Sequence, residues 1–172
     1  MVKHWDAQLN IDMEGEHSML EWRHVTDGPD LEHIRRLFKE YADWLGMDLC
    51  LQGFEEELNS LPGEYAPPHG ALFLVMDEST PVGCVALKQL NNGVAEMKRL
   101  YVKPELREQG LGKNLSMRAI DVAEALGYDY IRLDTLRRMD KSVKLYEYLG
   151  FKEIPPYYIN PEPDAVFMEK KL

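Results

Sequence analysis

The sequence predicts a mixed α+β fold, in which about four helices flank a mostly antiparallel, twisted central sheet. Apolar residues recur at helical spacing between residues 31 and 45. Residues 71–102 hold three segments rich in Val, Leu, Ala and Phe, separated by short polar breaks. From residue 104 onward, helical and extended patterns alternate. Strands joined by short turns favour antiparallel pairing, and the alternation that follows adds helices beside the same sheet.

Size and composition indicate one domain. The chain has 172 residues, of which 45% are hydrophobic and 29% are charged. It can therefore bury a core without disulfides or metals. Residues 1–16 show no steady periodicity, so we expect a flexible N-terminal arm there. The remaining residues, 17–172, are expected to form a single domain.

The sequence also predicts a cytoplasmic protein without a metal. No apolar run approaches membrane-spanning length, and the opening Met-Val-Lys-His-Trp-Asp lacks the apolar stretch of a secretory signal. Cys50 and Cys84 are too few for a disulfide framework and lack the spacing of a zinc site. The five histidines show no ligand spacing either, so no metal is expected.

The first expected elements are a strand and a long helix. Residues 18–25 alternate well enough for a strand. Asp27-Gly28-Pro29 then supplies a capping side chain and a proline suited to a helix start. The helix has one apolar face and ends near Gly46. Its apolar positions are Leu31, Ile34, Leu37, Phe38, Tyr41, Trp44 and Leu45.

A short helix and three strands are expected next. Residues 54–58 form the helix, and the loop after it contains Pro62-Gly63 and Pro67-Pro68, which rule out regular structure there. The strands are predicted at 71–76, 82–89 and 94–102. Asn91-Asn92-Gly93, between the last two strands, is typical of a hairpin turn.

The remaining elements alternate. A helix with Leu111, Leu115, Ala119, Val122 and Leu126 on one face ends at Gly127, a good C-terminal cap. A strand at 130–135 and a helix at 141–149 follow, the helix capped by Asp140 and stopped by Gly150. Further strands are expected near Phe151 and at 165–169.

The net charge of −10 is unevenly distributed along the chain. Residues 1–70 carry 15 acids and 5 bases, whereas residues 71–172 carry 15 of each. Such a surface repels nucleic acid and anionic lipid, so neither is an expected partner. The stretch 98–113 is locally basic, with five bases and two acids. Most of these charges suit solvated helix faces, but an acidic side can also receive a cationic acceptor while the basic stretch receives phosphates.

The segment 107–113 is the strongest single indication of a binding site. Gly110 and Gly112 let the backbone approach a ligand, and the helix that follows directs free N–H groups outward. Arg107 and Lys113 add positive charge to this anion site. A Walker loop would need Gly at 107 and Ser or Thr at 114, and only two of the three Rossmann glycines can be placed.

Two motifs together resemble the GNAT acetyltransferase superfamily. Arg107-x-x-Gly110-x-Gly112, after Lys98-Arg99-Leu100-Tyr101-Val102 and a proline, is similar to its coenzyme A signature. Leu145-Tyr146-Glu147-Tyr148-Leu149-Gly150-Phe151 resembles its second signature, a helix that bears a tyrosine and ends in Gly-Phe. The resemblance implies a central sheet that is splayed at the cofactor site, and it covers residues 94–151 closely.

The resemblance implies acetyl-CoA as cosubstrate and assigns its contacts. Backbone groups of Leu100, Tyr101 and Val102 pair with the pantetheine arm, and one N–H polarises the thioester carbonyl. The pyrophosphate is held by Arg107 and by the amides of Gln109, Gly110, Leu111, Gly112 and Lys113. Tyr146 lies beside the coenzyme sulfur, where its phenol donates a proton to the departing thiolate. A core tyrosine on an amphipathic helix is the alternative reading of Tyr146.

Glu96 is the candidate general base. It occupies the middle of a strand where a buried position is normally apolar, and alternation places it on one face with Lys98 and Leu100. Amine acetylation needs a group that takes a proton from an ammonium with a pKa of about 10. An ion pair of Glu96 with Lys98 or Arg99 is the alternative, and water can do the same work.

The acceptor site is implied by the resemblance alone. In relatives, the first two helices, their loop and the late strands line that site. Among the matching positions are Tyr41, Tyr65, Thr135, Tyr157 and Asn160. So many tyrosines suit a cationic amine, although each also suits packing. Late strands in this superfamily often pair between subunits, so a homodimer is one arrangement that the resemblance allows.

These observations predict an N-acetyltransferase. It would move an acetyl group from acetyl-CoA to a primary amine of a small molecule or peptide, by direct attack in a ternary complex. A non-catalytic acyl-CoA-binding or sensor module is the alternative. A phosphate-binding protein that uses ATP or NAD is disfavoured by the failed motif checks. The identity of the amine stays open.

Overall fold

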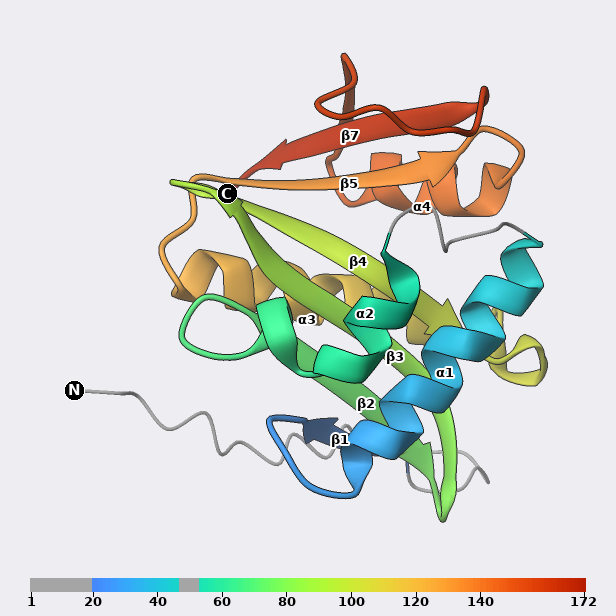
Figure 1. The fold of residues 1–172 in the computed structure, drawn as a ribbon. Helices are drawn as coiled ribbons and strands as arrows, with labels where there is room; N and C mark the ends of the chain where they lie inside the picture. Colours follow the sequence, from blue (N-terminus) through green and yellow to red (C-terminus); the bar gives the residue numbers. More distant parts are fainter. Residues whose placement is uncertain (1–19, 47–52) are drawn as a thin grey trace.

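A computed structural model describes residues 20–46 and 53–172 of the chain. The predicted arm, residues 1–16, lies outside the described residues, as does Cys50. Within the described ranges, seven strands form one sheet in the order β1-β2-β3-β4-β5-β7-β6 (Figure 1). They are β1 (Leu20–His24), β2 (Ala71–Asp77), β3 (Thr80–Asn91), β4 (Val94–Val102), β5 (Tyr130–Leu136), β6 (Lys152–Ile154) and β7 (Ala165–Lys171). Of the six strand pairs within the described residues, only β4 with β5 is parallel. The predicted fold class is confirmed.

Helices cover both faces of this sheet (Figure 1). One face carries α1 (Asp30–Leu45) and α2 (Phe54–Ser60), and the other carries α3 (Leu111–Ala125). The fourth helix, α4 (Asp140–Tyr148), places Tyr146 in the same core as α3. The apolar stripe of α1 buries Ile34, Leu37 and Phe38, as its 3.6-residue period predicts.

The central strands are buried on both faces. In β2, Leu72 and Leu74 pack beneath α1, while Phe73 and Val75 pack on the α3 side. A strand covered on both sides reads as a continuous apolar run rather than an alternating one, and 71–76 does so. The hairpin at Asn91-Asn92-Gly93 is confirmed, because β3 ends at Asn91, β4 begins at Val94 and Gly93 has a φ of 77°.

Strands β4 and β5 pair only at their beginnings. The parallel register runs from Val94 with Tyr130 to Glu96 with Arg132 and ends there. Strand β5 instead stays paired with β7 as far as Leu136. The two strands therefore diverge, and the part of β4 beyond Glu96 has no partner strand on the β5 side among the described residues. This split is the predicted splay of the sheet.

A β-bulge in β4 changes which side chains face the same way. Arg99 has a φ of 57°, and the register with β3 shifts between Cys84 and Ala86, so Arg99 and Leu100 stand opposite one residue. An extra residue reverses the alternation of the strand beyond it. Leu100 consequently packs toward α3, and the prediction that it shares a face with Glu96 was wrong.

Three local predictions were also wrong. Pro29, rather than Asp27, is the N-cap of α1, and no side chain caps it. Asp140 is the first residue of α4 and binds Lys144 one turn later at 2.8 Å, so it does not cap the helix either. A short 3-10 helix, η2 (Gly63–Tyr65), forms where prolines were expected to rule out regular structure. One such turn needs few backbone bonds, and Pro62 supplies a carbonyl for one of them.

Candidate active site

The first cleft lies in the gap between the diverging strands β4 and β5. It has a volume of about 450 Å³ and is also bordered by α1 and the start of α4. Residues 97–102 of β4 and 133–136 of β5 line it. Leu100, Tyr101 and Val102, predicted to meet the pantetheine arm, all lie in its wall. Because no strand among the described residues pairs with this edge of β4, its backbone groups are available to a ligand, apart from the Val102 carbonyl, which accepts from Arg107.

The N-terminus of α3 lies at one end of this cleft. The first backbone bond within the helix is donated by Asn114 to the Gly110 carbonyl, so the amides of Leu111, Gly112 and Lys113 precede it. Gly110 is the N-cap with a φ of 83°, a conformation that favours glycine. At Gly112, an added Cβ would meet its nearest neighbour, a Val102 methyl, only at 3.9 Å. The helix end therefore offers free donors beside open space, which suits an anion.

Not all predicted phosphate contacts line the cleft. Arg107 and Gly112 do, whereas the side chain of Leu111 is buried in the core. Gln109 reaches back to the Glu105 carbonyl at 3.5 Å. Lys113 lies over the ring of Tyr148 in α4, with its Nζ 4.8 Å from the ring centre. Their roles in binding phosphate stay predictions.

Arg107 has a contact that the sequence did not indicate. Its guanidinium lies 4.2 Å from the ring centre of Trp44 on α1, and its Nε donates to the Val102 carbonyl at 2.9 Å. An aromatic face attracts a cation and holds the flat guanidinium in place. Arg107 is thus fixed at the wall of the first cleft.

Tyr146 lies in the wall of the first cleft, opposite β4. Its side chain is buried, and its hydroxyl forms no hydrogen bond within residues 20–46 and 53–172. Burial, with smaller effects of Tyr41 and Asp134, raises the pKa of Tyr146 above the ordinary value of 10. The phenol is therefore protonated at neutral pH and free to donate.

Three predicted acceptor residues also line the first cleft. They are Tyr41, Thr135 and Asn160. Burial raises the pKa of Tyr41 to about 12. Asn160 donates to Asp134 at 3.0 Å, and the Tyr158 hydroxyl donates to the same carboxylate at 2.7 Å. Asp134 was not singled out from the sequence, although it is an acid within the predicted strand 130–135, the same kind of signal that singled out Glu96.

A second cleft of about 690 Å³ opens on the α2 side of β4. Residues of α2, η2, β3, β4 and the loop before β7 line it, among them the predicted residues Tyr65, Glu96 and Tyr157. Lys98 and Arg99 border both clefts. The bulge at Arg99 therefore lies where the two clefts meet.

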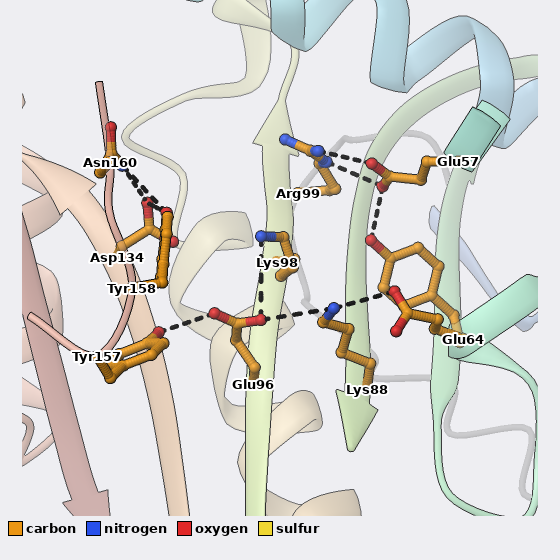
Figure 2. A network of polar contacts seen from close by, with 11 residues as sticks. Glu57, Glu64, Lys88, Glu96, Lys98, Arg99, Asp134, Tyr157, Tyr158 and Asn160 are labelled. Atoms are coloured by element: carbon orange, nitrogen blue, oxygen red, sulfur yellow. Dashed lines mark hydrogen bonds and ion pairs between the residues drawn. The ribbon is translucent and has the colours of Figure 1, made fainter. Parts of the chain in front are cut away.

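Glu96 is the most buried carboxylate of the second cleft. Figure 2 shows it between Tyr157 and the two lysines Lys88 and Lys98. The Tyr157 hydroxyl donates to its Oε1 at 2.8 Å. Its Oε2 lies 4.0 Å from the ammonium nitrogen of Lys88 and 3.9 Å from that of Lys98. Burial and the neighbouring Glu96 charge raise the pKa of Tyr157, so this phenol stays a donor. These contacts are compatible with both alternatives for Glu96, a general base and a structural ion-pair partner.

Arg99 and Glu57 form a buried ion pair that also includes Tyr65. The guanidinium donates to both carboxylate oxygens, at 3.0 and 2.6 Å, and the Tyr65 hydroxyl donates at 2.6 Å. Burial alone would raise the pKa of Glu57, but hydrogen bonds and charge from Arg99 outweigh it and lower the pKa below 4.5. Tyr65 is therefore a structural partner of this pair as well as a residue of the cleft.

Within residues 20–46 and 53–172, no group of three His, Cys, Asp or Glu side chains is arranged to hold a metal ion. No helix in the same ranges has the length and apolar character needed to span a membrane.

The comparisons with known proteins identify the family. Residues 31–151 match the model of the acetyltransferase (GNAT) family, which is more than half of the chain. The chain therefore belongs to this family. It is 42% identical over 145 residues to an uncharacterized N-acetyltransferase of Schizosaccharomyces pombe, covering 83% of this chain and 89% of that protein. The predicted enzyme class, an N-acetyltransferase that depends on acetyl-CoA, is confirmed.

Solved structures agree on the fold. An acetyltransferase from Streptococcus agalactiae superposes with a TM-score of 0.76 at 23% identity, covering 89% of this chain and 98% of that one. The PaiA N-acetyltransferase of Thermoplasma acidophilum, solved in complex with coenzyme A, gives 0.70 at 24% identity and covers 89% and 99%. The sheet and its helices are thus those of known acetyltransferases.

Proposed function

We propose that the chain transfers the acetyl group directly to a primary amine of a small molecule or peptide, with both substrates bound together. The observation that carries this proposal is the meeting of two clefts at Lys98 and Arg99, with Tyr146 in the wall of the first. One cleft can hold the acetyl donor while the other admits the acceptor. No covalent intermediate with the protein is needed.

The first cleft fits acetyl-CoA in its shape and its donors. The free amides at the start of α3, with Arg107 and Lys113 nearby, suit the pyrophosphate. The unpaired edge of β4 at Leu100, Tyr101 and Val102 suits the amide groups of the pantetheine arm. The PaiA N-acetyltransferase of the same fold was solved in complex with coenzyme A, which supports coenzyme A as the kind of ligand.

Acetyl-CoA supplies the acetyl group as a thioester and leaves as the free thiol. The amine nitrogen attacks the carbonyl carbon, so a C–N bond forms as the C–S bond breaks. Tyr146 gives its hydroxyl proton to the sulfur, and its raised pKa keeps that proton in place beforehand. Two protons leave the ammonium nitrogen: one passes to the base, and the other replaces the proton lost by Tyr146.

Either Glu96 takes the first of these protons through a bridging water, or a water molecule takes it instead. The Glu96 carboxylate lies in the second cleft, where its Oε2 is 4.0 Å from the Lys88 ammonium nitrogen and 3.9 Å from that of Lys98. Because Glu96 lines the second cleft and not the first, a bridging water would carry the proton from the amine to its carboxylate. Replacing Glu96 by Gln removes this route while leaving a partner for Tyr157.

The acceptor arrives as a cation, since a primary amine is an ammonium at neutral pH. The acids Glu56, Glu57, Glu64 and Glu96 line the second cleft. The excess of acids in residues 1–70 attracts the same charge over a longer range. A cytoplasmic location and a homodimer remain predictions from the sequence.

Tyr146→Phe tests the proposal. We expect kcat for thiol release from acetyl-CoA, measured with an amine found by screening, to fall by about 100-fold or more, with KM for acetyl-CoA little changed. Tyr130→Phe, at the far end of β5, is the matched control. Unchanged turnover in Tyr146→Phe would remove this residue from the mechanism. Thermal stabilisation by acetyl-CoA without thiol release from any amine would favour the sensor module instead.

A further inference from the structure

Asp134 lies on β5, beside the strand that carries Glu96 (Figure 2). The last residue pair of the two strands joins Glu96 to Arg132, and Asp134 is two positions further along β5. Because side chains of a strand alternate, Asp134 projects from the same face as Arg132, whereas Leu133 packs in the core on the α3 side. Asp134 is therefore the first side chain on this face of β5 beyond the split, and it lines the first cleft.

Two side chains of the loop before β7 hold one oxygen of this carboxylate. The Tyr158 hydroxyl and the Asn160 side-chain amide both donate to Oδ2 of Asp134, at 2.7 and 3.0 Å. Asn160 is itself fixed, because its Oδ1 accepts from the Glu162 backbone N–H at 2.9 Å. These bonds set the orientation of the carboxylate. Within residues 20–46 and 53–172, its other oxygen, Oδ1, accepts no hydrogen bond.

Asp134 also has no basic partner in the described part of the chain. No ion pair there includes it, whereas Asp140, the other acid that lines the first cleft, pairs with Lys144 at 2.8 Å. Two bases that line the same cleft, Arg99 and Arg138, are held by other acids. A half-buried carboxylate with one uncommitted oxygen and no cation beside it favours a ligand that brings a positive charge.

The carboxylate lies close to the tyrosine that is expected to act on the thioester. Tyr146 lines the same cleft. After burial and Tyr41, the charge of Asp134 contributes to the raised pKa of Tyr146. Such an effect weakens with distance, so the two side chains are near each other. A cation bound to Asp134 would therefore be held at the part of the cleft where the acetyl group is transferred.

We propose that Asp134 binds the ammonium group of the acceptor in the first cleft and fixes the position of its nitrogen. This inference rests on the proposed function and deepens it. The second cleft admits the acceptor, and the ammonium reaches through to Oδ1 of Asp134, while Tyr158 and Asn160 keep the carboxylate in place. The amine then loses its proton to Glu96 through water, or to water itself, before its nitrogen attacks the carbonyl carbon.

Uncharged analogues separate a charge contact from a fit of shape. Phenethylamine, hexylamine and tryptamine are each compared with the alcohol of the same skeleton, namely phenethyl alcohol, hexanol and tryptophol. Binding is measured by calorimetry on protein saturated with coenzyme A, which carries no acetyl group and so permits no turnover. For at least one pair, we expect the wild type to bind the amine about 10-fold or more tightly than the alcohol, as a charge-assisted hydrogen bond implies.

Asp134→Asn connects this preference to the residue. The amide keeps an oxygen for Tyr158 and Asn160 but loses the charge. We expect the affinity for the amine to fall by about 10- to 100-fold and that for the alcohol to change by less than about 2-fold. For an amine that is acetylated, its KM should rise by a similar factor while KM for acetyl-CoA stays the same. Asp121→Asn, at an exposed position of α3, is the matched control and leaves both affinities unchanged.

The outcomes separate this inference from the function on which it rests. Equal binding of amines and alcohols by the wild type would overturn the Asp134 site, and this comparison needs no variant. An unchanged affinity for the amine in Asp134→Asn, shown to be folded by thermal unfolding, would equally overturn it. Either result leaves acetyl transfer untouched. Absence of thiol release from acetyl-CoA with every amine of a wide screen would instead contradict the proposed function, while the binding comparison would still decide the Asp134 site.

Discussion

The two clefts differ in the groups that form them. The first consists largely of backbone: an unpaired strand edge, a helix N-terminus and two glycines that keep the space open. The second consists of paired side chains, namely Arg99 with Glu57, Lys88 with Glu64 and Glu96 with Tyr157. A backbone site tolerates substitution of the side chains around it, whereas a site of buried pairs depends on every member.

Glu57→Ala should give the largest effect and sharpens this comparison. It leaves the Arg99 guanidinium, whose side chain is only 5% exposed, without its carboxylate. We expect the free energy of unfolding to fall by about 3–5 kcal/mol, measured in urea. Glu55→Ala, at an exposed position of the same helix, is the control and should change it by less than about 0.5 kcal/mol.

The same ion pair predicts how stability depends on pH. The pKa of Glu57 is lower in the folded state than its ordinary value of 4.5. The Glu57 carboxylate therefore contributes its full stabilisation of the fold above pH 4.5. The contribution is lost as pH falls through the lower folded value. We therefore expect the free energy of unfolding, measured in urea, to decrease less between pH 7 and pH 3 for Glu57→Gln than for the wild type. An equal loss in both would contradict the assignment.

Arg107→Met should have a smaller effect, because the first cleft depends mainly on backbone donors. The variant keeps an apolar side chain beside Trp44 but removes the charge. We expect KM for acetyl-CoA to rise by about 5- to 10-fold, because one charge-assisted contact is lost, with kcat nearly unchanged. A loss of 1000-fold would show that the arginine, rather than the amides of α3, holds the pyrophosphate.

The smallest expected effect concerns Tyr146, whose ionisation should leave kcat unchanged at moderately alkaline pH. Since burial raises the pKa of Tyr146 above 10, its proton is retained as pH rises toward that value. Between pH 8 and 9.5, we expect kcat of the wild type not to fall through loss of the Tyr146 proton. The pH profiles of the wild type and Tyr146→Phe should therefore have the same shape over this range. A decline of kcat in the wild type alone, measured at saturating concentrations of both substrates, would mean that Tyr146 titrates earlier and lies in a wetter site.

Much of the first cleft could be predicted because its components are local in sequence. The glycines, the bases around them and the tyrosine helix lie within residues 107–151, and strand and helix periods identify the elements that carry them. The contact of Arg107 with Trp44 could not be predicted, since 62 positions separate them along the chain. The cap predictions at Asp27 and Asp140 failed because a suitable residue type does not by itself produce a capping bond.

The sequence by itself determined the fold class, the family and the segment at the start of α3, because apolar periodicity and a short glycine motif act over neighbouring residues. Only the tertiary structure decided how the second cleft is charged. Its residues come from positions as distant as 57 and 158, and the bulge at Arg99 turns two successive bases toward the same side of the sheet. A reversal of strand alternation by one extra residue is set by pairing with β3, which strand periodicity alone does not reveal.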